Sequence, residues 1–177
     1  MSSTRILAVA SWLILLPVSA AEVFAAAPEQ DLYVGWARAD ITPPKPVALV
    51  GQMHKRISKS VHDPLLATVL ALETRGQDGG KEQAIMISCD LSGIKKATQD
   101  RVKEAVKARL RDFDADKLFM NGTHTHTGPQ PEESFGRLYD TSKDPGVMQY
   151  AEYGQFFLKR VTDAVVQAWE GRKPGGV

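Results

Sequence analysis

Two histidines separated by one residue form the clearest chemical signal in the sequence. His124 and His126 lie in the segment NGTHTHTGP, directly after a short apolar run that we expect to be a strand. In an extended backbone, residues i and i+2 point to the same side, so both imidazoles would face one space. A His-x-His pair at a strand end can supply two nitrogen ligands to zinc. The pattern therefore predicts two metal ligands, the alternative being surface or hydrogen-bonded histidines.

Three further residues could belong to the same site. His62 precedes an apolar run, so it could supply a third metal ligand from a neighbouring strand or be a loop histidine bonded to backbone. Asp63 or Asp90 could orient the ring N–H of a ligating histidine. Asp90 ends another apolar run, so it could also act as a general base or cap the turn that follows.

Other polar or reactive residues are expected to lie outside the site. His54 sits in a basic stretch, and Glu132 and Glu133 follow the histidine motif in a polar loop, so we expect all three to be solvated. Cys89 is the single cysteine, which excludes an internal disulfide and a cysteine-cluster zinc site. We expect its thiol to be buried and inert.

Strands and helices alternate along the part of the chain that must position these residues. Apolar and branched runs predict strands over 32–41, 65–73, 83–89 and 117–120, and apolar stripes predict helices over 95–111 and 148–169. A glycine-rich turn joins the second and third strands, which indicates a hairpin, whereas residues 45–63 read as a long irregular stretch. The pattern predicts an α/β or α+β domain, in which a mixed β-sheet carries helices packed on one face.

The first 27 residues have the pattern of a secretory signal peptide. Arg5 is followed by an apolar stretch over 6–18 and then by small residues suited to cleavage. The stretch is shorter than the roughly 20 residues of a spanning helix, although an uncleaved membrane anchor is the alternative. We therefore expect a secreted or periplasmic protein whose domain occupies residues 28–177.

Composition narrows the class of protein. The chain has 177 residues, of which 43% are hydrophobic, and its 22 basic and 21 acidic residues give a formal net charge of +1. One domain of ordinary size is expected, with enough apolar residues for a core without disulfides. Because the charges balance, no strong field exists to recruit nucleic acid, so we expect no nucleic-acid partner.

Taken together, these motifs resemble the N-terminal domain of the neutral/alkaline non-lysosomal ceramidase family. Three segments carry the likeness: VGWARADITPP (34–44), VHDPLLATVLALE (61–73) and NGTHTHTGP (121–129), in which Thr127 stands where serine is usual. The likeness covers roughly residues 32–170. It implies a secreted, zinc-dependent amidase that cleaves the N-acyl bond of ceramide to a fatty acid and a sphingoid base.

The resemblance also implies a ligand set. Zinc (Zn2+) would be held by His62 and by one of His124 and His126, while the other lines the pocket or contacts the substrate. A glutamate and a tyrosine from later in the family's chain complete its site, and this sequence stops at Val177. We therefore expect a partial metal-hydrolase domain that is completed by oligomerisation or by Asp90 or His54, unless it is the front of a longer enzyme.

The implied substrate is a lipid or another small-molecule amide, with peripheral membrane contact as an option. Two alternatives stay open. One is a related metal-dependent amidase or esterase that acts on a different substrate. The other is a non-catalytic exported domain.

Overall fold

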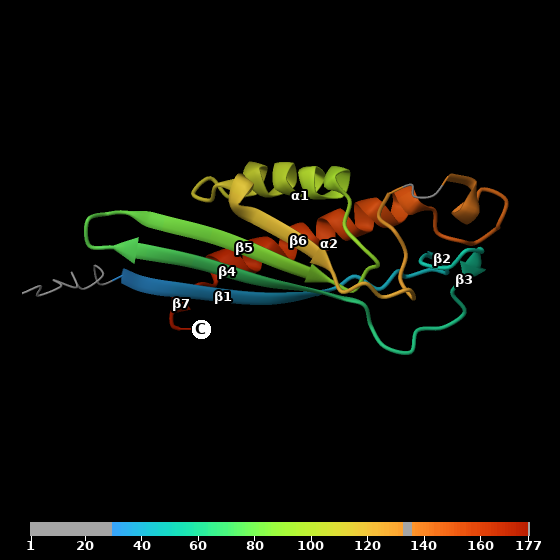
Figure 1. The fold of residues 1–177 in the computed structure, drawn as a ribbon, viewed down its shortest axis with the longest axis horizontal. Helices are drawn as coiled ribbons and strands as arrows, with labels where there is room; N and C mark the ends of the chain where they lie inside the picture. The colour runs from blue at the N-terminus through green and yellow to red at the C-terminus, as the bar shows by residue number, and fades with distance from the viewer. Residues whose placement is uncertain (1–29, 133–135, 177) are drawn as a thin grey trace, which may run out of the picture.

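The computed structural model describes residues 30–132 and 136–176, whose main body is a five-stranded sheet with two α-helices (Figure 1). The elements that build this body are β1 (Gln30–Asp40), β4 (Leu66–Gly76), β5 (Lys81–Cys89), α1 (Lys96–Arg109), β6 (Leu118–Gly122), α2 (Tyr150–Glu170) and β7 (Lys173–Pro174). The sheet order is β6-β5-β4-β1-β7, with β5 and β6 parallel and the other neighbours antiparallel. The predicted α+β fold with a mixed sheet is confirmed.

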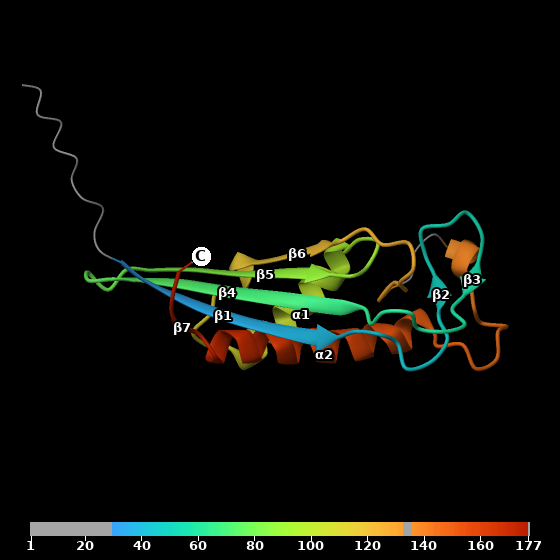
Figure 2. The same ribbon diagram turned by 90° about the horizontal axis from the view of Figure 1, so that it is seen from below.

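Both helices lie on the same face of the sheet, as the sequence predicted (Figure 2). Along β4, buried positions alternate with partly exposed ones, so one face of the strand enters the core. The helix α2 buries residues at helical spacing against that face. The shared core includes Ala67, Val69, Ala71, Ile85, Ile87, Val102, Val106, Phe157, Val161 and Val165.

A close approach fixes α2 against β1. A Cβ atom added to Gly35 would lie 1.9 Å from the carbonyl oxygen of Ala168, so only glycine allows this packing distance. Nearer the start of the helix, the hydroxyl of Tyr153 donates to the carbonyl of Ile41 over 2.9 Å. These two contacts hold α2 along β1. They also fix the position of Ile41, where the chain leaves the strand.

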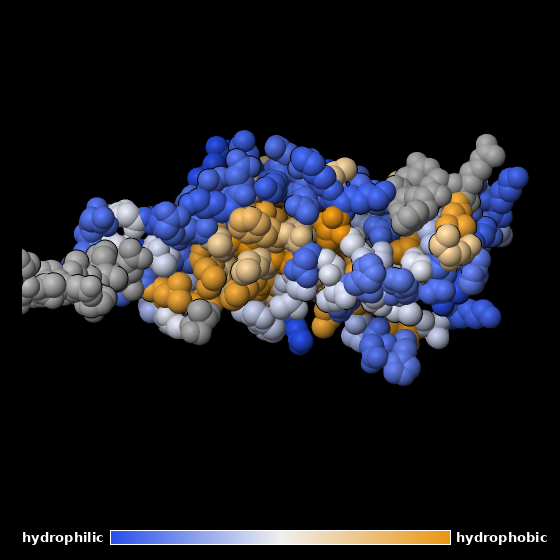
Figure 3. All heavy atoms as spheres, in the orientation of Figure 1, coloured by the Kyte–Doolittle hydropathy of each residue, from blue (hydrophilic) through white to orange (hydrophobic). Residues whose placement is uncertain are grey.

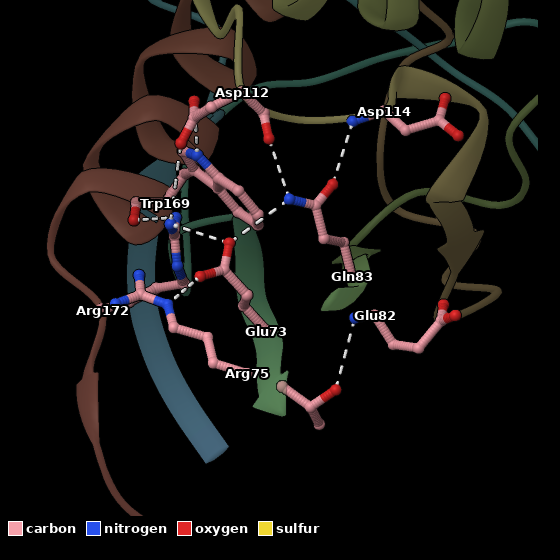
Figure 4. Close-up of polar contacts among 9 residues, drawn as sticks. Glu73, Arg75, Glu82, Gln83, Asp112, Asp114, Trp169 and Arg172 are labelled. Atoms are coloured by element: carbon pink, nitrogen blue, oxygen red, sulfur yellow. Dashed lines mark hydrogen bonds and ion pairs between the residues drawn. The ribbon is translucent and has the colours of Figure 1, made fainter. Parts of the chain in front are cut away.

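A cluster of charged groups lies between β4 and the end of α2 (Figure 4). Glu73 is only 2% exposed and accepts hydrogen bonds from Arg75, Arg172 and Gln83. Burial by itself would raise the pKa of Glu73, but the hydrogen bond from Arg75 and the charge of Arg172 outweigh it and lower the pKa. Arg172 also stacks over Trp169, so the cluster ties the end of α2 to β4.

The stretch predicted to be irregular contains a short ladder. Within 45–63, β2 (Ala48–Leu49) pairs antiparallel with β3 (Arg56–Ile57). Two-residue strands are too short to leave a periodic signal in the sequence. The predicted signal peptide, 1–27, lies outside the described residues. In the part of the chain that the structure describes, neither helix is long and apolar enough to cross a membrane.

Candidate functional site

The histidine motif lies at the sheet edge where two parallel strands end together. In the register of β5 and β6, Cys89 stands opposite Gly122, so the residues after both strands meet at one edge. The backbone N–H of Thr123 donates to Cys89 O over 2.9 Å, and that of His124 donates to Leu91 O over 3.0 Å. Ligands of open sheets bind outside such carboxyl ends.

The two imidazoles face each other, as the sequence predicted. Their ring centroids lie 5.0 Å apart, and the two Nε2 atoms are 3.3 Å apart. The Nδ1 atom of His124 lies 2.7 Å from the carbonyl oxygen of Ser92. Since a carbonyl only accepts, Nδ1 carries the proton in this contact, and the neutral ring keeps its lone pair on Nε2. A backbone carbonyl on the far ring nitrogen is the usual support of a metal-ligating histidine.

The backbone reaches this arrangement differently from the expected extended segment. The strand β6 ends at Gly122, and His124 has a φ angle of 68°. A non-glycine residue in the left-handed region costs on the order of 1–3 kcal/mol and persists only when its surroundings hold it there. Here the carbonyls of Leu91 and Ser92 hold the backbone and ring of His124. The left-handed backbone at His124, which we call the kink, therefore brings the two rings together, rather than the alternation of side chains along a strand.

Residues between β1 and β4 hold His126 in place. Gly51 has a φ angle of 93°, and a Cβ atom on it would lie 2.3 Å from the Cγ atom of His126. The Nη2 atom of Arg56 donates to the carbonyl oxygen of His126 over 2.8 Å. The ring therefore packs directly on the Gly51 backbone, while its own backbone is held from a position 70 residues away in the chain.

Asp90 anchors the motif through both carboxylate oxygens. Oδ1 accepts from the hydroxyl of Thr123 over 3.1 Å, and Oδ2 accepts from the backbone N–H of Leu66 over 3.0 Å. These bonds join the end of β5 to the start of β4 and to the residue before His124. Among the roles considered for Asp90, the geometry favours capping and positioning.

His62 and His54 lie on exposed parts of the chain. The Nδ1 atom of His62 lies 2.7 Å from Asp63 Oδ2, and the His62 side chain is 97% exposed. Of the two aspartates proposed to orient a histidine ring, Asp63 therefore makes such a contact, and the ring it contacts is that of His62. His54 is also exposed, as predicted for a solvated loop residue.

A cavity of about 1090 Å³ lies between the His62 loop and the sheet edge, and it is lined by Thr125, Thr127 and Pro129 of the histidine motif but not by His124 or His126. The loop side is lined by His62 and Asp63, and the sheet edge contributes Asp90, Thr125 and Thr127. Most of the other walls are apolar or proline, namely Pro43, Pro44, Pro46, Val47, Leu49, Ile57, Val61, Pro64, Leu65 and Pro129. The sequence alone did not reveal this apolar groove.

The histidine pair fits part of a zinc site. Two nitrogens that each lie about 2.0–2.1 Å from a tetrahedral zinc are roughly 3.3 Å apart. The two Nε2 atoms have this spacing. Within residues 30–132 and 136–176, however, no group of three or more His, Cys, Asp or Glu side chains could hold a metal ion. The described chain thus supplies two nitrogens at the correct spacing without a third ligand beside them.

The environment of Cys89 agrees with the expected inert thiol. The residue is fully buried in the core next to the site edge. Burial, with a smaller contribution from the charge of Asp90, raises the pKa of the Cys89 thiol to about 12. The thiolate is therefore scarce near neutral pH, and this side chain takes no part in the site.

The prediction that Glu132 is solvated was wrong. Its residue is only partly exposed, and its Oε1 atom is buried without a hydrogen-bond partner. The neighbouring Gln130 is 9% exposed and donates to the hydroxyl of Ser92 over 2.6 Å, while its own Oε1 has no partner. The segment after the motif folds back onto the body, which a polar composition did not indicate. Glu133 lies outside the described residues.

Three residues that support the histidines were not identified from sequence. Gly51 and Arg56 contact His126, and the carbonyl of Ser92 orients His124. Of these three residues, only Gly51 left a signal in the sequence, since a single glycine can mark a place where another part of the chain packs closely on the backbone. Nothing local distinguishes Arg56 from the lysines beside it.

Comparison with family models and with curated proteins finds no significant match for the chain. Among solved structures, the neutral ceramidase of Pseudomonas aeruginosa matches 83% of this chain with a TM-score of 0.66 and 17% identity. The described residues have a ceramidase-like fold. A structure described as ceramidase complexed with C2 also matches 83% of the chain, with a TM-score of 0.53 and 19% identity. The chain spans only 23% and 22% of these two ceramidase chains.

Proposed function

We propose that this chain carries part of the metal site of an exported, zinc-dependent amidase of the ceramidase type. The observation that carries the proposal is the pair of Nε2 atoms of His124 and His126, 3.3 Å apart at a sheet edge. The ceramidase-like fold supports the same assignment, since the two solved structures compared above are described as ceramidases. Export rests on the pattern of residues 1–27.

In this proposal His124 and His126 hold the zinc, with His62 as a further ligand brought in from its exposed loop. Ser92 keeps the proton of His124 on Nδ1, so the lone pair of its Nε2, which is hydrogen-bonded to Nε2 of His126 over 3.3 Å, would coordinate zinc in place of that bond. Gly51 and Arg56 hold His126 in place. Remaining ligands come from outside the described residues or from a second chain.

The chemistry required is the attack of water on an amide carbonyl. A bound zinc would polarise that carbonyl and lower the pKa of its water to about 7. The residues of this chain would position the metal and the substrate. Thr125 and Thr127 border the cavity, and their hydroxyls are hydrogen-bonded to each other over 2.8 Å. That bond uses one of the two hydroxyl protons, so the other can donate to the carbonyl of a substrate amide.

The cavity favours an acyl amide with an apolar chain. Its apolar and proline walls suit a hydrocarbon segment, and Thr125 and Thr127, the neighbours of His124 and His126 in the chain, form one side of it. An N-acyl sphingoid base therefore stands as the proposed substrate, cleaved to a fatty acid and a sphingoid base. A related amide or ester of similar shape would fit the same walls.

Metal binding tests the site directly. We expect the purified protein to bind zinc in calorimetric titration and the H124A/H126A variant to lose at least tenfold in affinity, as removing ligands should. The matched control is H54A, because His54 is an exposed histidine outside the cavity. Equal zinc affinity in the double variant and the wild type would refute the metal site.

A substrate panel tests the reaction. We expect the natural protein to hydrolyse N-acylsphingosines, with activity removed by a zinc chelator and restored by zinc. Fatty acyl esters and N-acyl amino acids form the comparison arm. Faster hydrolysis of those compounds would favour the related-hydrolase alternative, and no hydrolysis of any compound would favour a non-catalytic domain.

A further inference from the structure

The face of the sheet opposite the helices is apolar across four strands. Successive strand pairings place Trp36 opposite Leu70, Leu70 opposite Met86, and Met86 opposite Phe119. The next row joins Val34, Leu72 and Ala84. We call these seven residues the open face. Three of its large side chains are more than half exposed: Trp36 at 57%, Met86 at 51% and Phe119 at 59%.

Polar groups border the open face at both ends. Towards the histidine motif, the next row is Arg38, Thr68, Ser88 and Asn121. At the other end, the next row is Leu32, Thr74 and Glu82, and Glu82 pairs with Lys117 over 2.7 Å. Figure 3 shows the resulting continuous hydrophobic area over the middle of the sheet. An apolar centre with a polar rim is the usual layout of a protein interface.

No element of the described chain covers this face, because both helices lie on the other side (Figure 2). Aromatic side chains bury roughly 150–250 Å² each, so Trp36 and Phe119 at their exposures leave roughly 100 Å² apiece in water. With the other five residues the open face reaches roughly 400–500 Å². Two such faces together would bury roughly 800–1,000 Å², which is the size of a weak, reversible interface.

We propose that the occupant of the open face is a second copy of this chain, packed sheet against sheet. A two-fold axis lets one self-complementary patch meet itself. The open face suits this, since its longest row has large aromatics at both ends and smaller side chains between them. Two twisted sheets pack in this way with their apolar side chains interdigitated.

Charge does not oppose the pairing. The formal net charge of the chain is +1, so two copies repel each other little. The cation beside the open face is Arg38, whose guanidinium lies over the Trp36 ring at 5.4 Å from its centroid. A membrane surface is a poorer occupant, because anionic lipid attracts clustered lysine and arginine, and the rim has Arg38 and an already paired Lys117.

Analytical ultracentrifugation across a wide range of protein concentration tests the proposal. We expect the wild type to sediment as a dimer and the M86E/F119E variant as a monomer, because two carboxylates would be buried without partners. The matched control is M53E/V61E, since Met53 and Val61 are apolar residues at least as exposed as Met86 and Phe119 and lie on loops away from the sheet. The control should remain dimeric. Circular dichroism checks that each variant is folded.

Three outcomes would overturn the proposal. They are a wild type that stays monomeric at the highest concentration, a dimer that survives M86E/F119E, and a monomer that instead binds neutral phosphatidylcholine vesicles. If M86E/F119E does not fold, the milder F119S variant takes its place, with at least a tenfold weaker dimer expected. These readouts do not depend on zinc or on hydrolysis, so the dimer and the proposed enzyme stand or fall separately.

Discussion

At the scale of single residues, the candidate site depends on groups that neither react nor bind metal themselves. Gly51 touches the ring of His126, and the carbonyl of Ser92 orients the ring of His124. Supporting contacts of this kind are worth about 10–100-fold in metal affinity where they have been altered. The histidine pair should therefore be sensitive to changes at residues that never contact the metal.

Gly51→Ala tests this sensitivity. The added Cβ atom would overlap the His126 ring, so we expect zinc affinity to fall at least tenfold. Gly79→Ala is the matched control, because Gly79 also has a positive φ angle, 82°, but nothing lies within 4 Å of its added Cβ. Both variants should lose about 1 kcal/mol of stability from backbone strain. A similar loss of zinc affinity in both would contradict a specific role for Gly51.

The reactivity of Cys89 is a second prediction at this scale. With its pKa raised to about 12 by burial, the thiol should not react with an aromatic disulfide reagent in the native protein at about pH 8. It should react fully after unfolding in denaturant, where its pKa returns to about 8.5. Rapid labelling of the folded protein would mean that the site edge opens readily.

At the scale of elements, the two ends of the sheet have different roles: one carries the candidate site and the other holds α2. One end carries the histidine motif, and the opposite end joins α2 to β4 through the buried Glu73 and its donors. Removing one member of a buried, paired set leaves its partners without compensation, which costs about 3–5 kcal/mol. The packing of α2 along β1 and β4, and with it the sheet edge that carries the histidines, should depend on this anchor.

Glu73→Gln tests the anchor and its pH dependence. The folded-state pKa of Glu73 is lowered, so its stabilising contribution is present above the unfolded value of 4.5 and is lost as pH falls through the folded value. We expect the variant to unfold at lower denaturant concentration near neutral pH, with a smaller difference from wild type in acid. The control is Asp100→Asn, which removes one partner of the exposed Lys96–Asp100 ion pair in α1. It should leave the denaturant midpoint unchanged both near neutral pH and in acid. A difference that is independent of pH would show that the Glu73 charge is not the cause.

At the scale of the whole molecule, the buried core comes from a continuous part of the chain. The buried apolar residues run from Ala37 to Trp169. A body of this size with its own core is expected to fold independently. The proposed dimer adds a second layer to that body without altering it.

We therefore expect residues 28–177 to fold without the first 27. The measurement is thermal unfolding followed by circular dichroism, in which both versions should show one cooperative transition at a similar midpoint. If the proposed dimer forms, the midpoint should also rise with protein concentration, because association stabilises only the folded state. Loss of cooperative unfolding in the shorter protein would contradict the boundary placed after residue 27.

The sequence predicted that His124 and His126 face one space, but it assumed an extended backbone where the structure has a left-handed residue, His124. The sequence alone determined the order and type of the main elements and the glycine-turn hairpin. These features follow from local periodicity and turn residues, which act over a few positions in the chain. The resemblance to ceramidases likewise anticipated the fold that the solved structures share.

Tertiary structure decided how the site is held and which face of the sheet stays bare. Arg56 reaches His126 across 70 positions, and Gly51 packs against the same ring. The kink at His124 exists because the carbonyls of Leu91 and Ser92 hold it there. Contacts between distant segments depend on how whole elements pack, and no local pattern encodes them. The sequence predicted helices on one face of the sheet, but only the folded chain reveals that the uncovered face is apolar.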